Sequence, residues 1–197
     1  MIIYATNETM KRYNLKCPNE VISPEIKELS RLVVEKEKGD PLYAWGMKLF
    51  YFNGRKCVQF MNAQTRITVF LFFKNMADRG ILLNDVAHYL LWLYDDDLKM
   101  QDALKKYYNS SPLATFDKIT DRSLISTLNY NEMCFNNVIE RYVKNGVLQT
   151  KKINRSVANY LTTVTINGKK QYVVPKEFFR EAIMKRIGAD NYGNQET

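Results

Sequence analysis

His88 is the only histidine in this sequence and the residue best suited to general-base chemistry. On an expected helix over residues 85–94 it shares a stripe with Asp85, Trp92 and Asp95. A neighbouring carboxylate could orient the imidazole as a base. The alternative is a histidine that packs on Trp92 and is hydrogen-bonded by Asp85, and the lack of a nucleophile motif favours it. A single histidine also excludes His-rich metal sites, and every His-based triad would have to include His88.

Arg122 and Ser123 form a second candidate site, for an anion. They follow an expected turn, so a guanidinium, a hydroxyl and backbone N–H groups could bind an anion together. Arg55 and Lys56 leave the first expected hairpin and could join them if the sheet brings the two pairs together. Asn129, which follows in the same segment, completes this set of anion-binding candidates.

Two other interpretations of this segment remain open. Arg122 could instead form a buried ion pair with Asp121 or Asp117, and this structural role is the favoured one. Ser123 could act as a nucleophile, but it stands in neither a Gly-x-Ser-x-Gly elbow nor a Ser-x-x-Lys motif. His88 and Ser123 are therefore weak catalytic candidates.

Basic residues alternate with Tyr142 and Tyr160 in the last third of the chain. Basic side chains combined with stacking aromatics are typical of surfaces that bind RNA or single-stranded DNA. Lysines that protect exposed strand edges would give the same pattern. The residues of this candidate surface are Arg141, Lys144, Lys151, Lys152, Arg155, Lys169 and Lys170.

The net charge of +8 is unevenly distributed along the chain. Residues 1–74 carry +5, residues 75–117 carry −3 and residues 118–197 carry +6. A basic protein with an acidic middle segment could bind nucleic acid, an acidic protein or neither.

The run Asp95-Asp96-Asp97 could in principle hold Mg²⁺ through its carboxylates. Consecutive side chains point in different directions, however, and the loop lacks the glycine and the final glutamate of a calcium loop. Asp97 is better explained as the cap of the next helix. No phosphate loop, dinucleotide fingerprint, zinc spacing or paired-carboxylate motif is present, so we expect neither a metal nor a cofactor.

The chain of 197 residues is expected to form one domain over residues 1–188, with a flexible tail over 189–197. No apolar run approaches the roughly 20 residues of a membrane span, so no membrane contact is expected. The three cysteines are scattered, which argues against a disulfide framework or a zinc site and fits a reducing cytoplasm.

Three apolar strands in a row dominate the centre of the sequence, over residues 47–52, 55–61 and 67–73. Asn53-Gly54 joins the first two, because both residues accept the positive φ of a tight hairpin turn. Almost every residue of these strands is aromatic or aliphatic, so helices should cover at least one face. The predicted fold class is α+β, a mostly antiparallel sheet with this meander at its centre and helices packed on it.

Other elements are expected on both sides of the meander. The expected helices cover residues 6–13, 24–38, 85–94, 98–108, 129–145 and 175–187. Ser23-Pro24 is a clear helix start, and the stripe of Ile26, Leu29, Leu32 and Val33 follows it. Residues 2–5 and 113–116 are expected strands, residues 124–128 fit a strand or a helix, and Gly146 is placed as a helix stop. Asn167-Gly168 predicts a second hairpin over residues 161–174.

The chain resembles a bacterial family known only as a domain of unknown function. The resemblance rests on the MIIYAT start, on the Trp45-to-Phe72 block with Arg55-Lys56-Cys57 and an Asn62/Thr65 turn, and on Asp121-Arg122-Ser123 followed by Asn129. It covers nearly the full length. It implies a cytoplasmic protein of a bacterium, plasmid or phage, and it carries no reaction, ligand or catalytic residue.

Three functions are consistent with these features. The first is a small non-enzymatic binding protein whose basic surface contacts nucleic acid or an acidic partner protein. The second is a metal-independent enzyme for a phosphorylated or nucleotide substrate, in which Arg122, Ser123 and Arg55 bind the anion and His88 acts as the base. The third is an inhibitor or accessory protein of a mobile element, which rests on the resemblance alone.

Overall fold

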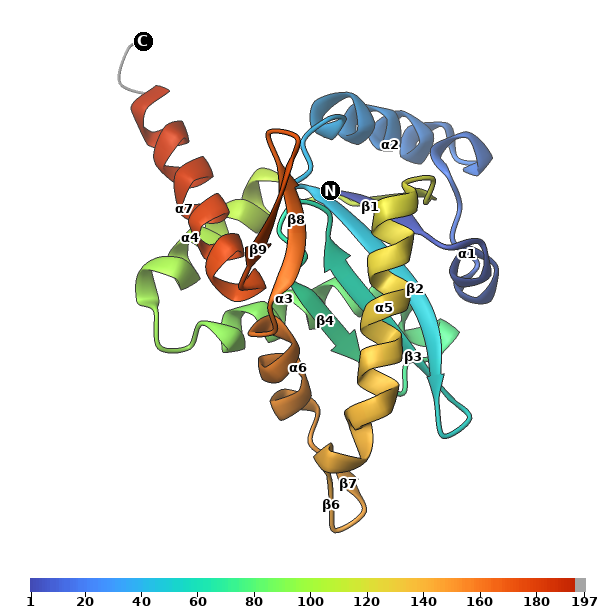
Figure 1. Ribbon diagram of the computed structural model, residues 1–197. Coiled ribbons are helices and arrows are strands. Elements are labelled where there is room, and N and C mark those ends of the chain that lie inside the picture. Colours follow the sequence, from blue (N-terminus) through green and yellow to red (C-terminus); the bar gives the residue numbers. More distant parts are fainter. Residues whose placement is uncertain (194–197) are drawn as a thin grey trace.

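A mixed five-stranded sheet forms the centre of the protein in the computed structural model, which describes residues 1–193 (Figure 1). The strand order is β4-β3-β2-β1-β5. The bounds are β1 Ile2–Ala5, β2 Ala44–Phe52, β3 Arg55–Asn62, β4 Thr68–Leu71 and β5 Thr115–Lys118. Helices lie on both faces of this sheet, which confirms the predicted α+β class.

The β2-β3-β4 meander forms as the sequence predicts. Asn53 and Gly54 both have positive φ, 48° and 70°, and their turn pairs Phe52 with Arg55. The meander occupies one side of the sheet, and β1 completes the other side by pairing in parallel with both β2 and β5. These parallel pairings join distant segments of the chain, so no local turn motif in the sequence predicts them.

The larger core lies on one face of the sheet, where apolar side chains of β1 to β4 meet helices α1, α3, α4 and α7. The bounds of these helices are α1 Asn7–Tyr13, α3 Leu82–Leu93, α4 Leu98–Ser110 and α7 Pro175–Gly193. At its centre the Trp45 indole donates to the Tyr107 hydroxyl over 3.0 Å, and that hydroxyl donates to the carbonyl of Leu42 over 2.8 Å. Burial raises the pKa of Tyr107 far above its ordinary value.

Helices α5 (Arg122–Val138) and α6 (Thr150–Ala158) cover the opposite face. Two separate apolar clusters hold them there, one around Phe50, Phe70 and Phe135 and the other formed by Met61, Leu124 and Leu128. The sequence predicts α5 from Asn129, whereas it begins at Arg122. Asp121 is the actual N-cap, since its carboxylate accepts from two backbone N–H groups of the first turn.

Gly146 ends no helix, contrary to the prediction. Asn145 and Gly146 have φ values of 51° and 74° and form the tight turn of a third hairpin. This hairpin joins β6 (Val143–Lys144) to β7 (Val147–Leu148), directly after the 3₁₀ helix η3 (Ile139–Tyr142). The same Asn-Gly chemistry that closes the two predicted hairpins therefore operates here as well.

The predicted hairpin around Asn167-Gly168 forms a separate two-stranded ribbon, β8 (Thr162–Ile166) and β9 (Lys169–Val173). It lies in front of the large sheet beside α5 (Figure 1). The last helix, α7, continues beyond Gly188, so residues 189–193 of the expected tail are helical. A glycine inside a helix costs about 1 kcal/mol relative to alanine, which the rest of a long helix can offset. Residues 194–197 lie outside the described residues.

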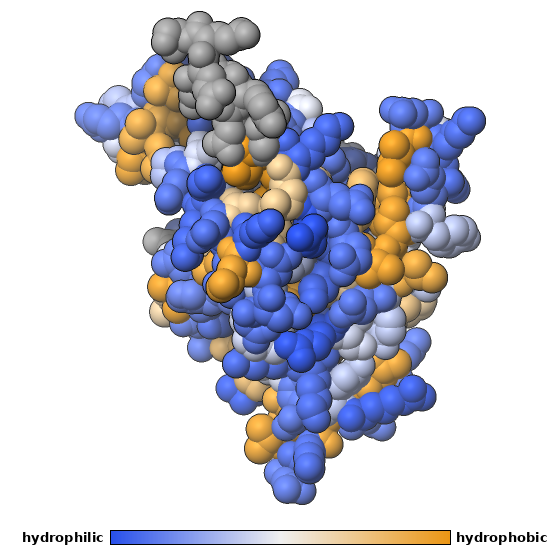
Figure 2. Space-filling view, turned by 90° about the vertical axis from the view of Figure 1, so that its left-hand side faces the viewer, coloured by the Kyte–Doolittle hydropathy of each residue, from blue (hydrophilic) through white to orange (hydrophobic). Residues whose placement is uncertain are grey.

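Helix α2 (Pro24–Glu37) begins as expected, since the Ser23 hydroxyl accepts from the Ile26 N–H. Its apolar stripe is not buried as a whole: Val33 is buried, whereas Ile26, Leu29 and Leu32 are about half-exposed. Two further 3₁₀ helices are η1 (Pro18–Glu20) and η2 (Met76–Gly80). The side of the molecule that carries α4 and α7 is mostly hydrophilic, with apolar side chains in separate patches (Figure 2). No helix within residues 1–193 has both the length and the apolarity needed to cross a membrane.

Candidate ligand pocket

A cavity of about 440 Å³ opens between α5, α6 and the base of the β8–β9 ribbon, with the edge of the sheet behind it. The volume lies in the range that small-molecule sites occupy. Polar and apolar side chains both line the cavity. They are Arg66, Thr68, Tyr130, Asn131, Cys134, Phe135, Asn137, Val138, Tyr142, Ile153, Val157, Tyr160, Leu161, Thr162 and Pro175.

Helix α5 contributes one wall of this pocket. Leu124, Leu128 and Phe135 are buried against the sheet and fix the rotation of the helix. That rotation turns Tyr130, Cys134 and Asn137 toward the cavity, at spacings of four and three residues on one helix face. Asn131 anchors this wall because its amide donates to the Thr68 hydroxyl over 3.1 Å.

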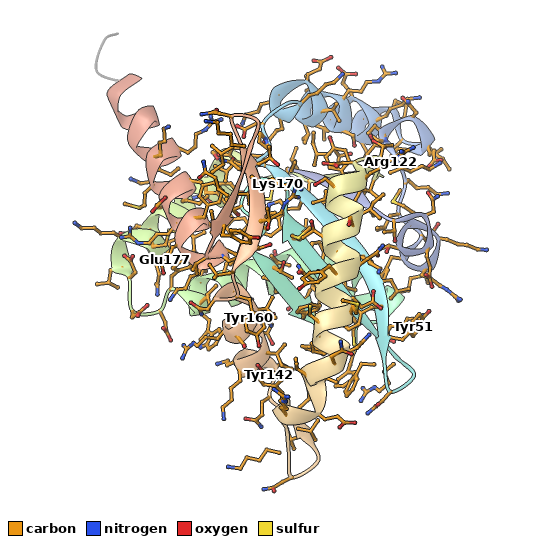
Figure 3. The ribbon with its side chains drawn as sticks, in the orientation of Figure 1. Tyr51, Arg122, Tyr142, Tyr160, Lys170 and Glu177 are labelled. Carbon is orange, nitrogen blue, oxygen red and sulfur yellow. The ribbon has the colours of Figure 1, made fainter. Side chains whose placement is uncertain are left out.

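Two tyrosines form the opposite wall. The Tyr142 hydroxyl donates to the Ser156 hydroxyl on α6 over 2.8 Å, and burial raises the pKa of Tyr142. Hydrogen bonding with Ser156 and with Tyr142 lowers the pKa of Tyr160. Figure 3 shows Tyr142 and Tyr160 close together on the α6 side of the lower half of α5. Their hydroxyls therefore belong to one hydrogen-bonded group at the pocket wall.

Arg66 reaches the pocket from the turn between β3 and β4. The turn is built around the buried Asn62, whose side-chain oxygen accepts from the backbone N–H groups of Gln64 and Thr65 at 3.1 and 3.0 Å. Its amide nitrogen donates to the carbonyl of Leu42 over 2.8 Å. Within this turn Arg66 takes a left-handed backbone conformation, with φ of 63°. Such a conformation is uncommon for a residue with a side chain and is maintained by its surroundings.

The pocket offers stacking surfaces and hydrogen bonds but few groups that could catalyse a reaction. Its lining includes three tyrosines, two asparagines and one arginine, and no histidine, lysine or carboxylate. Cys134 is half-buried in the α5 wall, and a hydrogen bond with Cys134 raises the pKa of Tyr130. The cavity is therefore equipped to hold a ligand, and it lacks an obvious proton acceptor.

His88 lies far from this arrangement. It is exposed on α3, which covers the face of the sheet opposite α5. Asp85, its expected partner, instead binds the Lys74 ammonium at 2.6 Å. The structure thus separates His88 from Arg122 and Ser123, and the convergence that the enzyme hypothesis requires is not present.

The predicted anion-binding residues are also dispersed. Arg122 is exposed at the upper end of α5, whereas Arg55 lies at the β2–β3 turn over the ring of Phe73, 3.8 Å from its centroid. Lys56 pairs with Tyr51 near the same turn. Asn129 accepts a hydrogen bond from Lys48 over 2.6 Å and does not cap a helix.

Ser123 does meet an arginine, but a different one. Its hydroxyl accepts from Nη2 of Arg66 over 3.4 Å. Arg122 forms no ion pair with Asp121 or Asp117 among the described residues, so its favoured structural role is wrong. Sequence reasoning singled out Ser123 but not its partner Arg66, which is a single charge between two of the most apolar strands.

The seven residues of the candidate basic surface occupy three separate places. Arg141 and Lys144 are near the β6–β7 turn, and Lys169 and Lys170 are on the β8–β9 ribbon at the other end of the molecule (Figure 1). The remaining three, Lys151, Lys152 and Arg155, lie on α6. Lys151 and Arg155 lie over the Trp92 ring, with their charged groups 5.2 and 4.7 Å from its centroid.

The aspartate run has a structural role at its last residue. Asp97 caps α4 as predicted, accepting from the Met100 N–H over 3.0 Å, and also binds Arg180 of α7 at 2.7 Å. Asp95 lies 4.0 Å from Arg155. Among residues 1–193 no group of three or more potential metal ligands gathers at one place.

Residues 2–178 match a family model described as a domain of unknown function, DUF6933. The chain belongs to this family. The matched region contains the whole sheet and all residues that line the pocket. A search of curated proteins found no match.

Proposed function

We propose that this DUF6933 protein is a non-enzymatic binding protein that takes a small planar molecule into the pocket between α5 and α6. The observation that carries the proposal is the lining itself. Tyr130, Tyr142 and Tyr160 supply aromatic surfaces, and Phe135, Val138, Ile153 and Val157 supply an apolar floor. A cavity with this combination binds by burial and stacking, and a few polar groups set the orientation of the ligand.

Asn131, Asn137 and Thr162 are the neutral polar groups that would orient the ligand. Each side-chain amide both donates and accepts hydrogen bonds, and so do the ring edges of heterocyclic compounds. Asn137 lies on α5 and Thr162 at the start of β8, so these polar groups come from different elements of the pocket lining. This arrangement favours a molecule with polar groups on two edges over a simple hydrocarbon.

A ligand-observed NMR screen of planar aromatic and heterocyclic compounds tests the proposal. Binders should be found for the wild-type protein and lost in Val138→Phe, which fills the cavity. The control, Val143→Phe, adds the same group at an exposed position on β6 and should keep them. Binding that survives Val138→Phe, or a screen without any binder, would refute the proposal.

A second candidate ligand is single-stranded nucleic acid, favoured by Trp92 with Lys151 and Arg155 beside it. Fluorescence anisotropy with a labelled oligonucleotide at low salt is the direct test. Binding that weakens on Lys151→Gln and Arg155→Gln, and as salt is raised, would support this surface. Binding that Lys169→Gln and Lys170→Gln weaken instead would place the contact on the β8–β9 ribbon.

Cys17, Cys57 and Cys134 are free thiols. This supports the expectation of a reducing, cytoplasmic environment.

A further inference from the structure

The guanidinium of Arg66 lacks the partners that a buried cation normally has. Its Nε and Nη1 atoms are buried and make no hydrogen bond, and Nη2 makes only the 3.4 Å bond to the Ser123 hydroxyl. Burial lowers the pKa of Arg66, and the charge of Asp121 opposes that shift. An arginine remains protonated in spite of such a shift, so a positive charge stays at the pocket wall.

Asp121 is an acid whose charge acts on Arg66, but its carboxylate is already engaged. Its Oδ1 accepts from the backbone N–H groups of Ser123 and Leu124 at 2.8 and 3.2 Å. No carboxylate among the described residues forms an ion pair with Arg66. A buried charge without a close counter-ion is unfavourable, and an anion placed beside it would remove much of that cost.

The turn holds Arg66 at this place. The left-handed backbone of Arg66 is fixed by the side-chain hydrogen bonds of Asn62 and by the Arg66 N–H, which donates to the Asn62 carbonyl over 3.0 Å. An unfavourable backbone conformation and an unpaired buried charge thus coincide at one residue that lines the cavity. Strain of this kind is typical of residues that clamp ligands.

We propose that the ligand of this pocket carries an oxyanion, a carboxylate or a phosphate, which binds Arg66 while its planar part lies against the tyrosines. The proposal rests on the proposed function and names the ligand class. The planar fork of a guanidinium matches both oxyanions with two parallel hydrogen bonds. Because Nε and Nη1 are inaccessible in the free protein, binding requires the Arg66 side chain to shift toward the cavity.

Matched pairs of probes test the charge requirement directly. Benzoate with benzamide tests the carboxylate, and phenyl phosphate with phenol tests the phosphate, so the two pairs also separate the two sources of charge. Each is titrated into ¹⁵N-labelled protein, and the Nε–Hε signal of Arg66 is followed together with the backbone signals of α5. At least one anion should bind about tenfold or more tightly than its neutral counterpart and should shift the Arg66 signal.

Two variants complete the test. Arg66→Gln should abolish the preference for the anion and leave the affinity for the neutral probe nearly unchanged, whereas Arg122→Gln, at an exposed neighbouring arginine, should keep the preference. If Arg66→Gln does not fold, the response of the Arg66 signal in the wild-type protein still shows whether the anion binds Arg66. Anionic and neutral probes of equal affinity, or an unmoved Arg66 signal, would overturn the oxyanion site and leave the pocket proposal intact. Failure of every probe and of the wider screen would overturn both.

Discussion

Asn154 of α6 binds the backbone of Phe70 at two points, as a neighbouring strand would. Its Oδ1 accepts from the Phe70 N–H over 2.7 Å, and its Nδ2 donates to the Phe70 carbonyl over 3.0 Å. Phe70 lies in β4, the edge strand of the sheet. One side-chain amide therefore satisfies two edge groups that would otherwise be open to pairing with another chain. The same contact fixes α6 against the sheet, next to the pocket that Ile153 and Val157 line.

Asn154→Ala should lower the free energy of unfolding by about 2 kcal/mol or more, since two buried backbone groups lose their partners. Urea denaturation followed by circular dichroism measures the effect. The matched control is Asn159→Ala, because Asn159 is exposed and donates only to the Arg155 carbonyl of its own helix. Equal losses in the two variants would show that the contact with Phe70 contributes little. Faster aggregation of Asn154→Ala alone would support the role in edge protection.

Gly46 sets the distance between β2 and α5. A Cβ atom at this position would lie 3.1 Å from Cδ1 of Leu128 and 3.2 Å from Cδ2 of Leu124, which is closer than side chains normally approach. Gly46→Ala should therefore push α5 outward and lower the free energy of unfolding by about 1 kcal/mol or more. Chemical denaturation measures this loss, and α5 shifts in NMR spectra report the movement.

Two further variants separate crowding from other effects of the added methyl group. Gly80→Ala is the control, because nothing lies within 4 Å of a Cβ there. In a Leu128→Ala background the free-energy cost of Gly46→Ala should become smaller, since one of the two crowding side chains is gone and Leu124 gains room to move. An unchanged cost in that background would contradict the close approach of β2 and α5.

Local signals predicted the framework of the fold. Asn53-Gly54 and Asn167-Gly168 gave two hairpins correctly, because the positive φ at both positions is a property of the dipeptide itself. Asn145-Gly146 obeys the same rule, but the apolar residues before it also suit a helix, and the helix interpretation was wrong. The parallel placement of β1 between β2 and β5 depends on tertiary packing and has no signal within any short segment.

The pocket was harder to predict, since its residues come from eight separate elements or turns. Helix α6 was missed because the apolar residues of segment 147–153 fit a strand as well as a helix. Tyr130, Cys134 and Asn137 share a helix face, a signal that was present but indistinguishable from an ordinary exposed stripe. Arg66 stood out only as a charge beside apolar strands. The burial of Arg66 and its lack of partners depend on α5, and the start of this helix was predicted seven residues too late.

Asp97 should make the stability of the protein depend on pH. The hydrogen bond from Arg180, and after it the Met100 N–H, lowers the pKa of Asp97. A carboxylate with a lowered folded-state pKa stabilises the protein above its ordinary pKa of about 3.9, and this contribution is lost as the pH falls toward the lowered value. Asp97→Asn keeps a cap acceptor and removes the charge. The difference in the free energy of unfolding between wild type and variant should therefore narrow as the pH falls from about 5 to about 2.

Urea denaturation at a series of pH values measures that difference. Because water reaches the Asp97–Arg180 pair, we expect this difference in the free energy of unfolding to be about 1 kcal/mol or less at neutral pH. Asp102→Asn provides the control, since Asp102 is highly exposed and lies 3.6 Å from Lys105 on the same helix. A difference that stays constant down to pH 2 would mean that the ion pair between α4 and α7 does not stabilise the fold.

The three thiols should react in an order set by their positions. Cys57 is fully buried in the phenylalanine cluster beneath α5, so a reagent cannot reach its thiol in the folded protein. Burial also raises the pKa of this thiol, so little of the reactive thiolate forms. Cys134 is half-buried in the pocket wall. In a Cys17→Ser background, a thiol reagent should therefore modify Cys134 in the native protein and Cys57 only after unfolding. Mass spectrometry of timed samples identifies each modified residue.

The rate at Cys134 also reports on the pocket itself. Val138→Phe narrows the cavity one helical turn from Cys134 and should slow the reaction several-fold, whereas Val143→Phe on β6 should leave the rate unchanged. A compound that binds in the pocket should protect Cys134 in the wild-type protein in the same way. If Cys134 reacts at one rate in all these samples, its thiol is reached from outside the pocket. Native modification of Cys57 at the rate of Cys134 would show that α5 opens from the sheet far more readily than two apolar clusters beneath it should allow.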